Sequence, residues 1–149
     1  MVPFRTHRNV IRILLVEDTL GDIRLMREAL AASGSQHHEL LVVQDGEQAM
    51  RFLHHEPPFN DSPRPDLVFL DLNLPKMDGR EVLSTMKQDV ALRSIPVIVL
   101  TTSASDQDVH SAYDLHANCY IRKPGDLDEF LRVIRACEEF WFHVVRLPQ

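Results

Sequence analysis

Residues 67–79 read L-V-F-L-D-L-N-L-P-K-M-D-G, and this stretch is the strongest indication of the fold class. Four apolar residues, Leu67 to Leu70, end at the charged Asp71, and the pair Asp78-Gly79 precedes a segment whose apolar residues recur with a helical period. A short, continuous apolar run beside a helical segment is typical of a strand buried on both faces of a parallel sheet. The stretch therefore predicts a strand, a loop and a helix of an α/β fold, with a carboxylate at the end of the strand.

The same alternation extends in both directions from this stretch. Four further apolar runs predict strands at Val10–Val16, Glu39–Val43, Pro96–Leu100 and Asn118–Ile121. Helical periods predict helices from Thr19 to Ser33 with Gly34 as the stop, from Gly46 to His55, after Asp78-Gly79, from Ser105 to Leu115, and from Asp126 onward with Leu127, Phe130, Leu131, Ile134, Cys137, Trp141 and Val144 on one face. The predicted fold class is α/β, a doubly wound (βα)5 arrangement with helices on both faces of a parallel five-stranded sheet.

Length and composition predict one ordinary domain. The 149 residues carry 16 Lys and Arg against 22 Asp and Glu, a formal net charge of −6. This negative balance disfavours nucleic acid as a partner, and no apolar run approaches the ~20 residues of a membrane helix, so we expect no membrane contact. Two cysteines, Cys119 and Cys137, are too few for a disulfide framework. We therefore expect a cytoplasmic protein.

The domain boundaries follow from the same pattern. We expect a flexible N-terminal end at residues 1–8, a single domain with an extended last helix at residues 9–143, and a C-terminal tail at residues 144–149. The proline-rich segment from Glu56 to Pro65 predicts a loop between elements rather than between domains, because the strand after it is needed to complete the sheet.

Functional side chains gather where the predicted strands end. Parallel α/β sheets bind ligands beyond the carboxyl ends of their strands, at the point where the strand order reverses. If the order is 2-1-3-4-5, the first and third strands are neighbours there, and three carboxylates converge. The strand ends carry Glu17-Asp18, Asp71, Thr101-Thr102 and Lys123-Pro124.

Three converging carboxylates predict a metal site. They repel one another unless a cation lies among them, and oxygen ligands suit Mg²⁺ or Mn²⁺ rather than zinc. A carboxylate is also a nucleophile toward phosphorus when cationic groups neutralise the phosphoryl oxygens. Lys123 and the hydroxyl of Thr101 are suitable for that task, so phosphoryl chemistry on an aspartate is the predicted function of this edge.

The chain resembles the receiver domain of bacterial two-component response regulators from about Val10 to Trp141. The resemblance rests on I-L-L-V-E-D, L-V-F-L-D-L-N-L-P-K-M-D-G, V-I-V-L-T-T and Y-I-R-K-P, each at a predicted strand end. Asp71 and Thr101 are 30 positions apart, and Thr101 and Lys123 are 22 positions apart, which also suits the layout of the family. The resemblance implies a flavodoxin-like fold with the strand order 2-1-3-4-5.

The resemblance also implies a role for each site residue. Asp71 is the implied phosphoacceptor. Mg²⁺, or Mn²⁺, is held by Asp18 directly, by Glu17 through water, by Asp71, and by the backbone carbonyl of Asn73. The phosphoryl-binding and switch residues are Thr101, Thr102, Tyr120, Lys123 and Pro124, with a cis bond between Lys123 and Pro124 as is usual in the family. Thr102 is larger than the common residue there, and we expect it to narrow access to the phosphoryl group.

The implied function is that of a single-domain response regulator. It accepts a phosphoryl group from a partner sensor histidine kinase in an Mg²⁺-dependent reaction. It is a phosphoacceptor rather than an enzyme, although it catalyses its own phosphorylation from small donors and its own dephosphorylation. Only Val144 to Gln149 follow the last helix, so we expect output through protein contact. The segments Y-D-L-H-A-N-C-Y-I-R-K-P and E-E-F-W resemble regulators of bacterial phytochrome kinases.

Aromatic and apolar residues near the C-terminus predict a homodimer. The candidates are Tyr113, Tyr120, Val133, Phe140 and Phe142, on the fourth helix, fifth strand and last helix, because clustered exposed aromatic side chains favour a partner. The helix from Ser105 to Leu115 is mostly polar, so we expect weak packing and an adjustable position for it. The alternative is that the aromatic tail folds back on its own domain.

Two other functions remain open at this point. A haloacid dehalogenase-like aspartyl phosphatase also forms an aspartyl phosphate, but it carries its nucleophile on the first strand with a second Asp two residues later, where this chain has Asn73. An unphosphorylated pseudo-receiver would be a binding module only. Every chemical group for phosphorylation is present, which argues against this second alternative.

Overall fold

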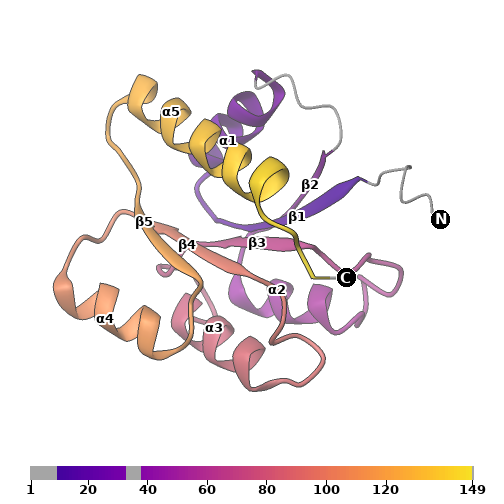
Figure 1. Ribbon diagram of the computed structural model, residues 1–149. Coiled ribbons are helices and arrows are strands. Elements are labelled where there is room, and N and C mark those ends of the chain that lie inside the picture. Colours follow the sequence, from indigo (N-terminus) through magenta and orange to yellow (C-terminus); the bar gives the residue numbers. More distant parts are fainter. Residues whose placement is uncertain (1–9, 33–37, 149) are drawn as a thin grey trace.

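Strands and helices alternate along the whole chain (Figure 1). The computed structural model describes residues 10–32 and 38–148. The elements are β1 (Ile11–Val16), α1 (Leu20–Ala32), β2 (His38–Val43), α2 (Gly46–Leu53), β3 (Leu67–Leu70), α3 (Gly79–Gln88), β4 (Val97–Thr101), α4 (Asp106–Asp114), β5 (Cys119–Arg122), α5 (Leu127–Glu138) and the π-helix η1 (Glu139–Val144). The predicted five βα units are confirmed. The expected N-terminal end at residues 1–8 and the stop at Gly34 lie outside the described residues.

All five strands run parallel in one sheet with the order β2-β1-β3-β4-β5. Val16 pairs with Leu70, so β1 and β3 end side by side, and Thr101 pairs with Arg122 at the ends of β4 and β5. The resemblance predicted this order correctly. Its consequence is that the residues directly after β1, β3 and β5 meet at one edge of the sheet.

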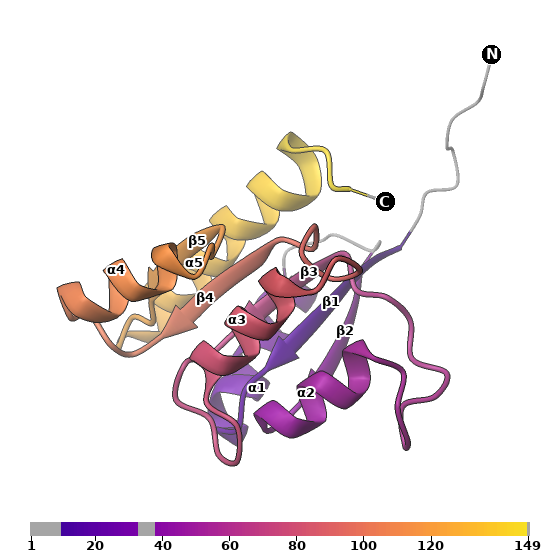
Figure 2. The ribbon, with the colours of Figure 1, turned by 90° about the horizontal axis from the view of Figure 1, so that it is seen from below.

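Helices cover the sheet in two layers (Figures 1 and 2). On β1, Ile13 and Leu15 pack with α1 and α5, whereas Leu14 and Val16 pack with α2, α3 and α4. This alternation follows from the geometry of a strand, in which successive side chains point to opposite faces. Two apolar cores therefore clamp β1 and β3 and hold their carboxyl ends in place.

Polar caps begin four of the helices. Asp45, Asp78, Ser105 and Asp126 each accept a hydrogen bond from a backbone N–H in the first turn of α2, α3, α4 and α5 respectively. A side-chain acceptor at this position satisfies an N–H that has no partner within the helix. These caps therefore fix the residue at which each of the four helices begins.

The last two helices partly depart from the sequence prediction. The predicted polar character of α4 is confirmed, since Ala112 is its buried residue. Leu127 and Val144 were assigned to the apolar face of the last helix, but both are exposed. Leu127 is the first residue of α5, one turn before the buried Phe130. Val144 ends η1, whose wider turn changes the direction of successive side chains from the α-helical period on which the prediction relied.

Glycine at position 79 is required by a close backbone approach. A Cβ there would overlap the backbone of Asp71 and lie 2.6 Å from Leu72 Cα. We expect Gly79→Ala to lower the free energy of unfolding by about 1–3 kcal/mol, the usual cost of overpacking. Urea denaturation measures the change.

Gly21 provides the matched control for this substitution. A Cβ at Gly21 meets nothing within 4 Å, and the residue lies in α1. Gly21→Ala should leave the free energy of unfolding unchanged or raise it by up to about 1 kcal/mol, because alanine favours helix. Equal losses in both variants would contradict the close-approach explanation.

Candidate functional site

The carboxyl edge of the sheet gathers a buried polar cluster. Glu17 follows β1, Asp71 follows β3, Thr101 ends β4 and Lys123 follows β5. All four residues are buried, with exposed fractions of 2%, 7%, 0% and 8%. Buried charges are costly unless they are paired, so the contacts within this cluster determine its stability and its chemistry.

Lys123 is the cation at the centre of the cluster. Its Nζ donates hydrogen bonds to Glu17 Oε1 at 2.6 Å, to Asp22 Oδ2 at 2.8 Å and to Asp71 Oδ2 at 3.1 Å. An ammonium group has three N–H donors, and all three have carboxylate partners. Burial alone would lower the pKa of Lys123, but the hydrogen bonds and charges of its acidic neighbours outweigh burial and raise the pKa above its ordinary value.

Both oxygens of Asp71 have defined partners. Oδ1 accepts hydrogen bonds from Thr101 Oγ1 at 2.9 Å and from the Asn73 backbone N–H at 3.1 Å, and Oδ2 accepts from Lys123. The Asp71 N–H in turn donates to Val16 O at 3.1 Å, which ties the residue to β1. The carboxylate is therefore held in one orientation by donors from three different strands or strand ends.

Glu17 is the most buried carboxylate of the cluster. Burial raises the pKa of Glu17, and the hydrogen bond from Lys123 opposes this shift only in part. The charge of Asp71 raises the pKa further. Glu17 Oε2 also accepts a hydrogen bond from the Thr19 N–H at 3.1 Å. The raised pKa of Glu17 therefore reflects burial first and the neighbouring negative charge of Asp71 second.

Glu17, Asp18 and Asp71 fit a divalent metal ion. One carboxylate oxygen from each lies within 4.8 Å of the other two, and Asp18 is exposed at the mouth of the cluster. Lys123 alone does not balance these carboxylates together with Asp22. Oxygen ligands with an excess negative charge suit Mg²⁺ or Mn²⁺, so the donor set agrees with the predicted cofactor.

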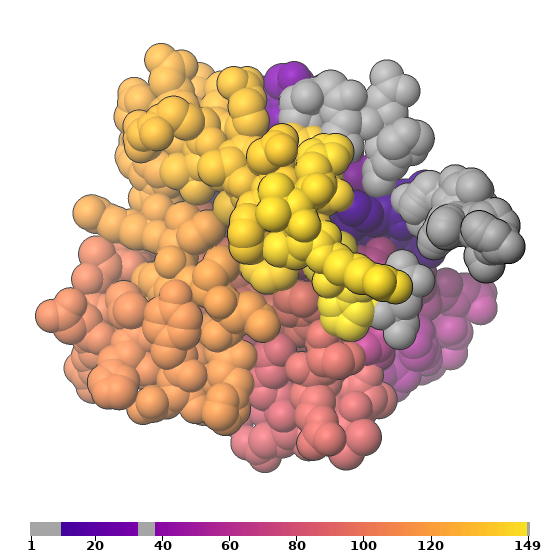
Figure 3. Space-filling model, viewed as in Figure 1, coloured from indigo at the N-terminus to yellow at the C-terminus, as the bar shows by residue number. Residues whose placement is uncertain are grey.

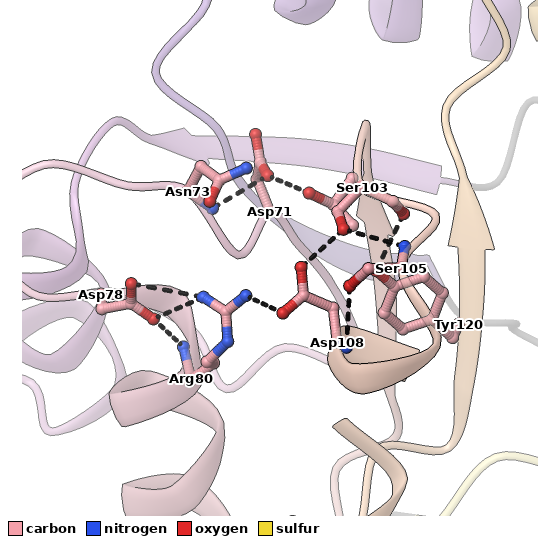
Figure 4. A network of polar contacts seen from close by, with 9 residues as sticks. Asp71, Asn73, Asp78, Arg80, Ser103, Ser105, Asp108 and Tyr120 are labelled. Carbon is pink, nitrogen blue, oxygen red and sulfur yellow. Dashed lines mark hydrogen bonds and ion pairs between the residues drawn. The ribbon is translucent and has the colours of Figure 1, made fainter. Parts of the chain in front are cut away.

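A second polar network joins α3 to α4 beside the cluster (Figure 4). Arg80 Nη2 donates to Asp108 Oδ1 at 2.7 Å, and Arg80 also pairs with Asp78 at 3.3 Å. Ser103 Oγ donates to the other oxygen of Asp108 at 2.5 Å, and Tyr120 Oη donates to Ser103 O at 2.9 Å. The loop between β4 and α4 is thus held from both sides.

The structure separates the predicted site residues into two groups. Those that lie together around Asp71 are Glu17, Asp18, Asn73, Thr101 and Lys123. Tyr120 is half-buried and lies with the second network instead, as Figure 4 shows. Thr102 is exposed at the start of the β4–α4 loop, and Pro124 is half-buried after Lys123.

The expected cis bond between Lys123 and Pro124 is wrong. Across residues 10–32 and 38–148, the cis peptide bond is the one between Pro57 and Pro58. The Lys123 N–H donates to Thr101 O at 2.7 Å, which extends the pairing of β5 with β4 beyond the last strand residue. This hydrogen bond holds the backbone of Lys123 beside β4, and its side chain reaches Asp71 in the cluster.

The sequence reading missed three residues of the site. Asp22 could have been predicted, because it is an acidic residue in the first turn of α1, and this turn lies close to the end of β1. Arg80 and Asp108 gave no such signal, since their contact joins residues 28 positions apart.

The comparisons with known proteins agree with this geometry. The sequence profile of the response regulator receiver domain matches residues 13–135. The chain belongs to the response regulator receiver family. The receiver is 48% identical over 136 residues to the response regulator Rcp1 of Synechocystis sp. (strain ATCC 27184 / PCC 6803 / Kazusa), covering 91% of this chain and 92% of Rcp1.

Two solved structures resemble the receiver over nearly its whole length. The phosphorylated cyanobacterial phytochrome response regulator RcpA is 48% identical, with a TM-score of 0.90 over 94% of this chain and 99% of RcpA. The Mn²⁺-bound form of Rcp1 is 47% identical, with a TM-score of 0.89 over 93% and 99% of the two chains.

Family membership gives the receiver its general role. It is a phosphorylation-accepting response regulator, a signalling protein whose partner is a histidine kinase and whose cofactor is a divalent metal ion. This excludes the haloacid dehalogenase-like alternative, and the nucleophile of that class would also follow the first strand rather than β3. Within the part of the chain that the structure describes, no helix has both the length and the apolar character to cross a membrane.

The second network makes a prediction about pH. Hydrogen bonds from Ser103 and Arg80 hold the pKa of Asp108 below its ordinary value. The network therefore stabilises the folded receiver above the ordinary Asp pKa, and this contribution is lost as the pH falls through the lowered pKa. We expect Arg80→Met and Ser103→Ala each to raise the pKa of Asp108 in a carboxyl ¹³C NMR titration. An unchanged pKa in both variants would contradict the network.

Proposed function

We propose that Asp71 is the residue that accepts the phosphoryl group. The observation that carries this proposal is the arrangement of its carboxylate, which is buried, faces the acidic cluster, and has donors fixed on both oxygens. Thr101 and Asn73 hold Oδ1, and Lys123 holds Oδ2. The phosphorylated state of RcpA, at 48% identity, supports the assignment.

The transfer itself requires position and charge more than acid–base catalysis. An Asp71 carboxylate oxygen forms a bond to phosphorus as the P–N bond of the kinase phosphohistidine breaks, and the bonding pair leaves with the imidazole nitrogen. With acetyl phosphate as donor, the P–O bond breaks and acetate leaves. Lys123 and the hydroxyl of Thr101 lie beside the attacking carboxylate, where they can donate to the phosphoryl oxygens.

We assign the metal site to Glu17, Asp18, Asp71 and the backbone carbonyl of Asn73. A bound Mg²⁺ or Mn²⁺ supplies positive charge that neutralises the phosphoryl oxygens during transfer. The protein side chains fix where that charge lies. Asp18 is the exposed member of the cluster and gives the ion access, whereas Glu17 is buried beneath it.

Phosphorylation is proposed to act on α4 through Thr101 and Tyr120. When the phosphoryl group takes the Thr101 hydroxyl, the loop after β4 moves with it, and Ser103 in that loop bonds both Asp108 and Tyr120. The few buried residues of α4 make it the element that can shift at least cost.

The same site supports two self-catalysed reactions. Asp71 accepts a phosphoryl group from a small donor because the cluster, rather than the kinase, supplies the neutralising groups. Water then hydrolyses the acyl phosphate at a rate set by access past Asn73, Thr102 and Ser103. Thr102 and Asn73 are exposed at this entrance.

Intact mass spectrometry tests the phosphoacceptor. Incubation with acetyl phosphate and Mg²⁺ should add one phosphoryl group to the wild-type protein, and the addition should disappear in Asp71→Asn or when Mg²⁺ is chelated. The reason is that no other carboxylate has this combination of donors and metal ligands among the described residues.

Asp61→Asn is the control, because Asp61 is exposed in the proline-rich loop that precedes β3, whereas Asp71 follows the other end of that strand. It should be phosphorylated like the wild type. A phosphoryl group that persists in Asp71→Asn would place the acceptor elsewhere, and no addition to the wild type from either acetyl phosphate or a kinase would indicate a pseudo-receiver.

We further propose a phytochrome histidine kinase as the partner and a stand-alone receiver as the acting form. The chain covers 92% of Rcp1 and 99% of the phytochrome response regulator RcpA, so it matches these relatives almost from end to end. On this proposal residues 9–143 form the receiver and residues 144–149 its tail. We place it in the cytoplasm, where thiols such as Cys119 and Cys137 stay reduced.

We also propose a homodimer across α4, β5 and the last helix. Atoms of these elements lie next to one another on the face shown in Figure 3. Phe140 and Tyr113 are 48% and 47% exposed and are free to meet a second copy. Phe142, Val133 and Tyr120 are half-buried, and the Phe142 ring lies 6.0 Å from that of His38, so part of the aromatic tail packs on its own domain.

Phe140→Ser should weaken the dimer by about tenfold or more, because a buried phenylalanine side chain contributes ~1.5–3 kcal/mol. Sedimentation velocity over a concentration series measures the dissociation constant. Leu20→Ser, which removes an exposed apolar side chain from α1, should leave that constant unchanged. A wild-type protein that stays monomeric at high micromolar concentration, with and without a phosphoryl mimic, would end the dimer proposal.

A further inference from the structure

Lys123 has three carboxylate partners, and Asp22 is the one that does not belong to the metal-binding cluster of Glu17, Asp18 and Asp71. It lies in the first turn of α1, and its Oδ2 accepts from Lys123 Nζ at 2.8 Å. We propose that Asp22 is a positioning residue that keeps the Lys123 ammonium aimed at Asp71 while the other two carboxylate partners are engaged elsewhere. This inference rests on the proposed acceptance of the phosphoryl group by Asp71.

The argument begins with the number of donors. Lys123 has three N–H groups, and Glu17, Asp22 and Asp71 take one each. Glu17 and Asp71 also belong to the acidic cluster that fits the metal, whereas Asp22 does not. When that cluster turns toward the ion, and Asp71 becomes bonded to phosphorus, two of the three partners change. Asp22 is the partner that stays.

The position of Asp22 suits a fixed anchor. Its side chain is 28% exposed, and that of Lys123 is 6% exposed, so the pair closes the cluster on its α1 side. Ile23 and Met26, next to Asp22 on α1, are buried against the sheet and hold the helix in place. A lysine side chain has a flexible stem of four methylene groups, so its ammonium group can adopt many positions. A hydrogen-bond partner on a rigid element restricts those positions.

Two variants separate the effect of the hydrogen bond to Asp22 from the effect of its negative charge. Asp22→Asn removes the negative charge but keeps a side-chain oxygen that accepts a hydrogen bond, and Asp22→Ala removes both. Asp128→Asn is the matched control, because Asp128 is an exposed first-turn residue of α5. Asp22 is partly exposed, and its substitution leaves both cores intact.

NMR of the lysine ε-methylene groups gives the readout. The chain has three lysines, Lys76, Lys87 and Lys123, so ¹³C-lysine labelling gives one ε-methylene signal for each. The signal that disappears in Lys123→Met is that of Lys123. In the wild type with Mg²⁺ and beryllofluoride as phosphoryl mimic, the two Hε protons of Lys123 should have separate shifts, as in a fixed side chain. They should stay separate in Asp22→Asn and Asp128→Asn, and merge in Asp22→Ala.

The rate of phosphorylation by acetyl phosphate gives a second readout. Asp22→Ala should slow it by about tenfold, less than the hundredfold loss that a 1 Å misplacement can cause, and Asp22→Asn should lie near the wild type. Separate Hε shifts and a wild-type rate in Asp22→Ala would overturn the proposal. Equal slowing in Asn and Ala variants would also overturn it, because charge alone would then explain the effect.

The Mg²⁺-loaded protein without a phosphoryl donor distinguishes this proposal from the phosphoacceptor assignment. In that state the acidic cluster faces the ion, and Asp22 is the partner left to hold Lys123. If the two Hε shifts of Lys123 merge in Mg²⁺-loaded Asp22→Ala but stay separate in the Mg²⁺-loaded wild type, while wild-type Asp71 gains no mass from acetyl phosphate, the anchor stands and the phosphoacceptor assignment fails. If the wild type is phosphorylated and Lys123 is unaffected by Asp22→Ala, the reverse holds.

Discussion

The ion pairs around one buried ammonium group organise the carboxyl edge of this receiver. Lys123 reaches three carboxylates from β1, α1 and β3, and its own backbone is tied to β4. Burial and, to a smaller extent, the charge of Asp71 raise the pKa of Glu17. One positive charge does not balance the acidic groups gathered here, and this excess of negative charge suits a divalent ion. In the proposed phosphoryl transfer, a carboxylate of this cluster is the nucleophile, and the Lys123 ammonium group and the divalent ion are the two sources of positive charge.

The sheet makes this crowding possible. Because β1 and β3 are neighbours in the order 2-1-3-4-5, their ends bring Glu17, Asp18 and Asp71 together, and the two apolar cores hold the strands against the repulsion. Backbone approach is equally close around Gly79, where α3 begins against Asp71. The stability of the cores therefore supports a site that would not assemble from its charges alone.

The second network connects the site to the surface. Thr101 touches Asp71, Ser103 follows two residues later, and Ser103 bonds both Asp108 on α4 and Tyr120 on β5. Arg80 ties Asp108 back to α3. A movement of Thr101 thus reaches the loosely packed α4 through a short chain of hydrogen bonds, and α4 and β5 border the surface proposed for dimerisation.

Periodicity and strand ends are local properties of a chain, so the βα units and most of the side chains around Asp71 could be predicted from the sequence. The remaining features depend on long-range packing. Asp22 meets Lys123 across 101 positions, and Arg80 meets Asp108 across 28, so both contacts depend on how helices pack. The wider turn of η1 also changes the α-helical period on which the sequence prediction relied. A local pattern can nominate a residue, as the first-turn position of Asp22 does, but long-range packing decides which residue it contacts.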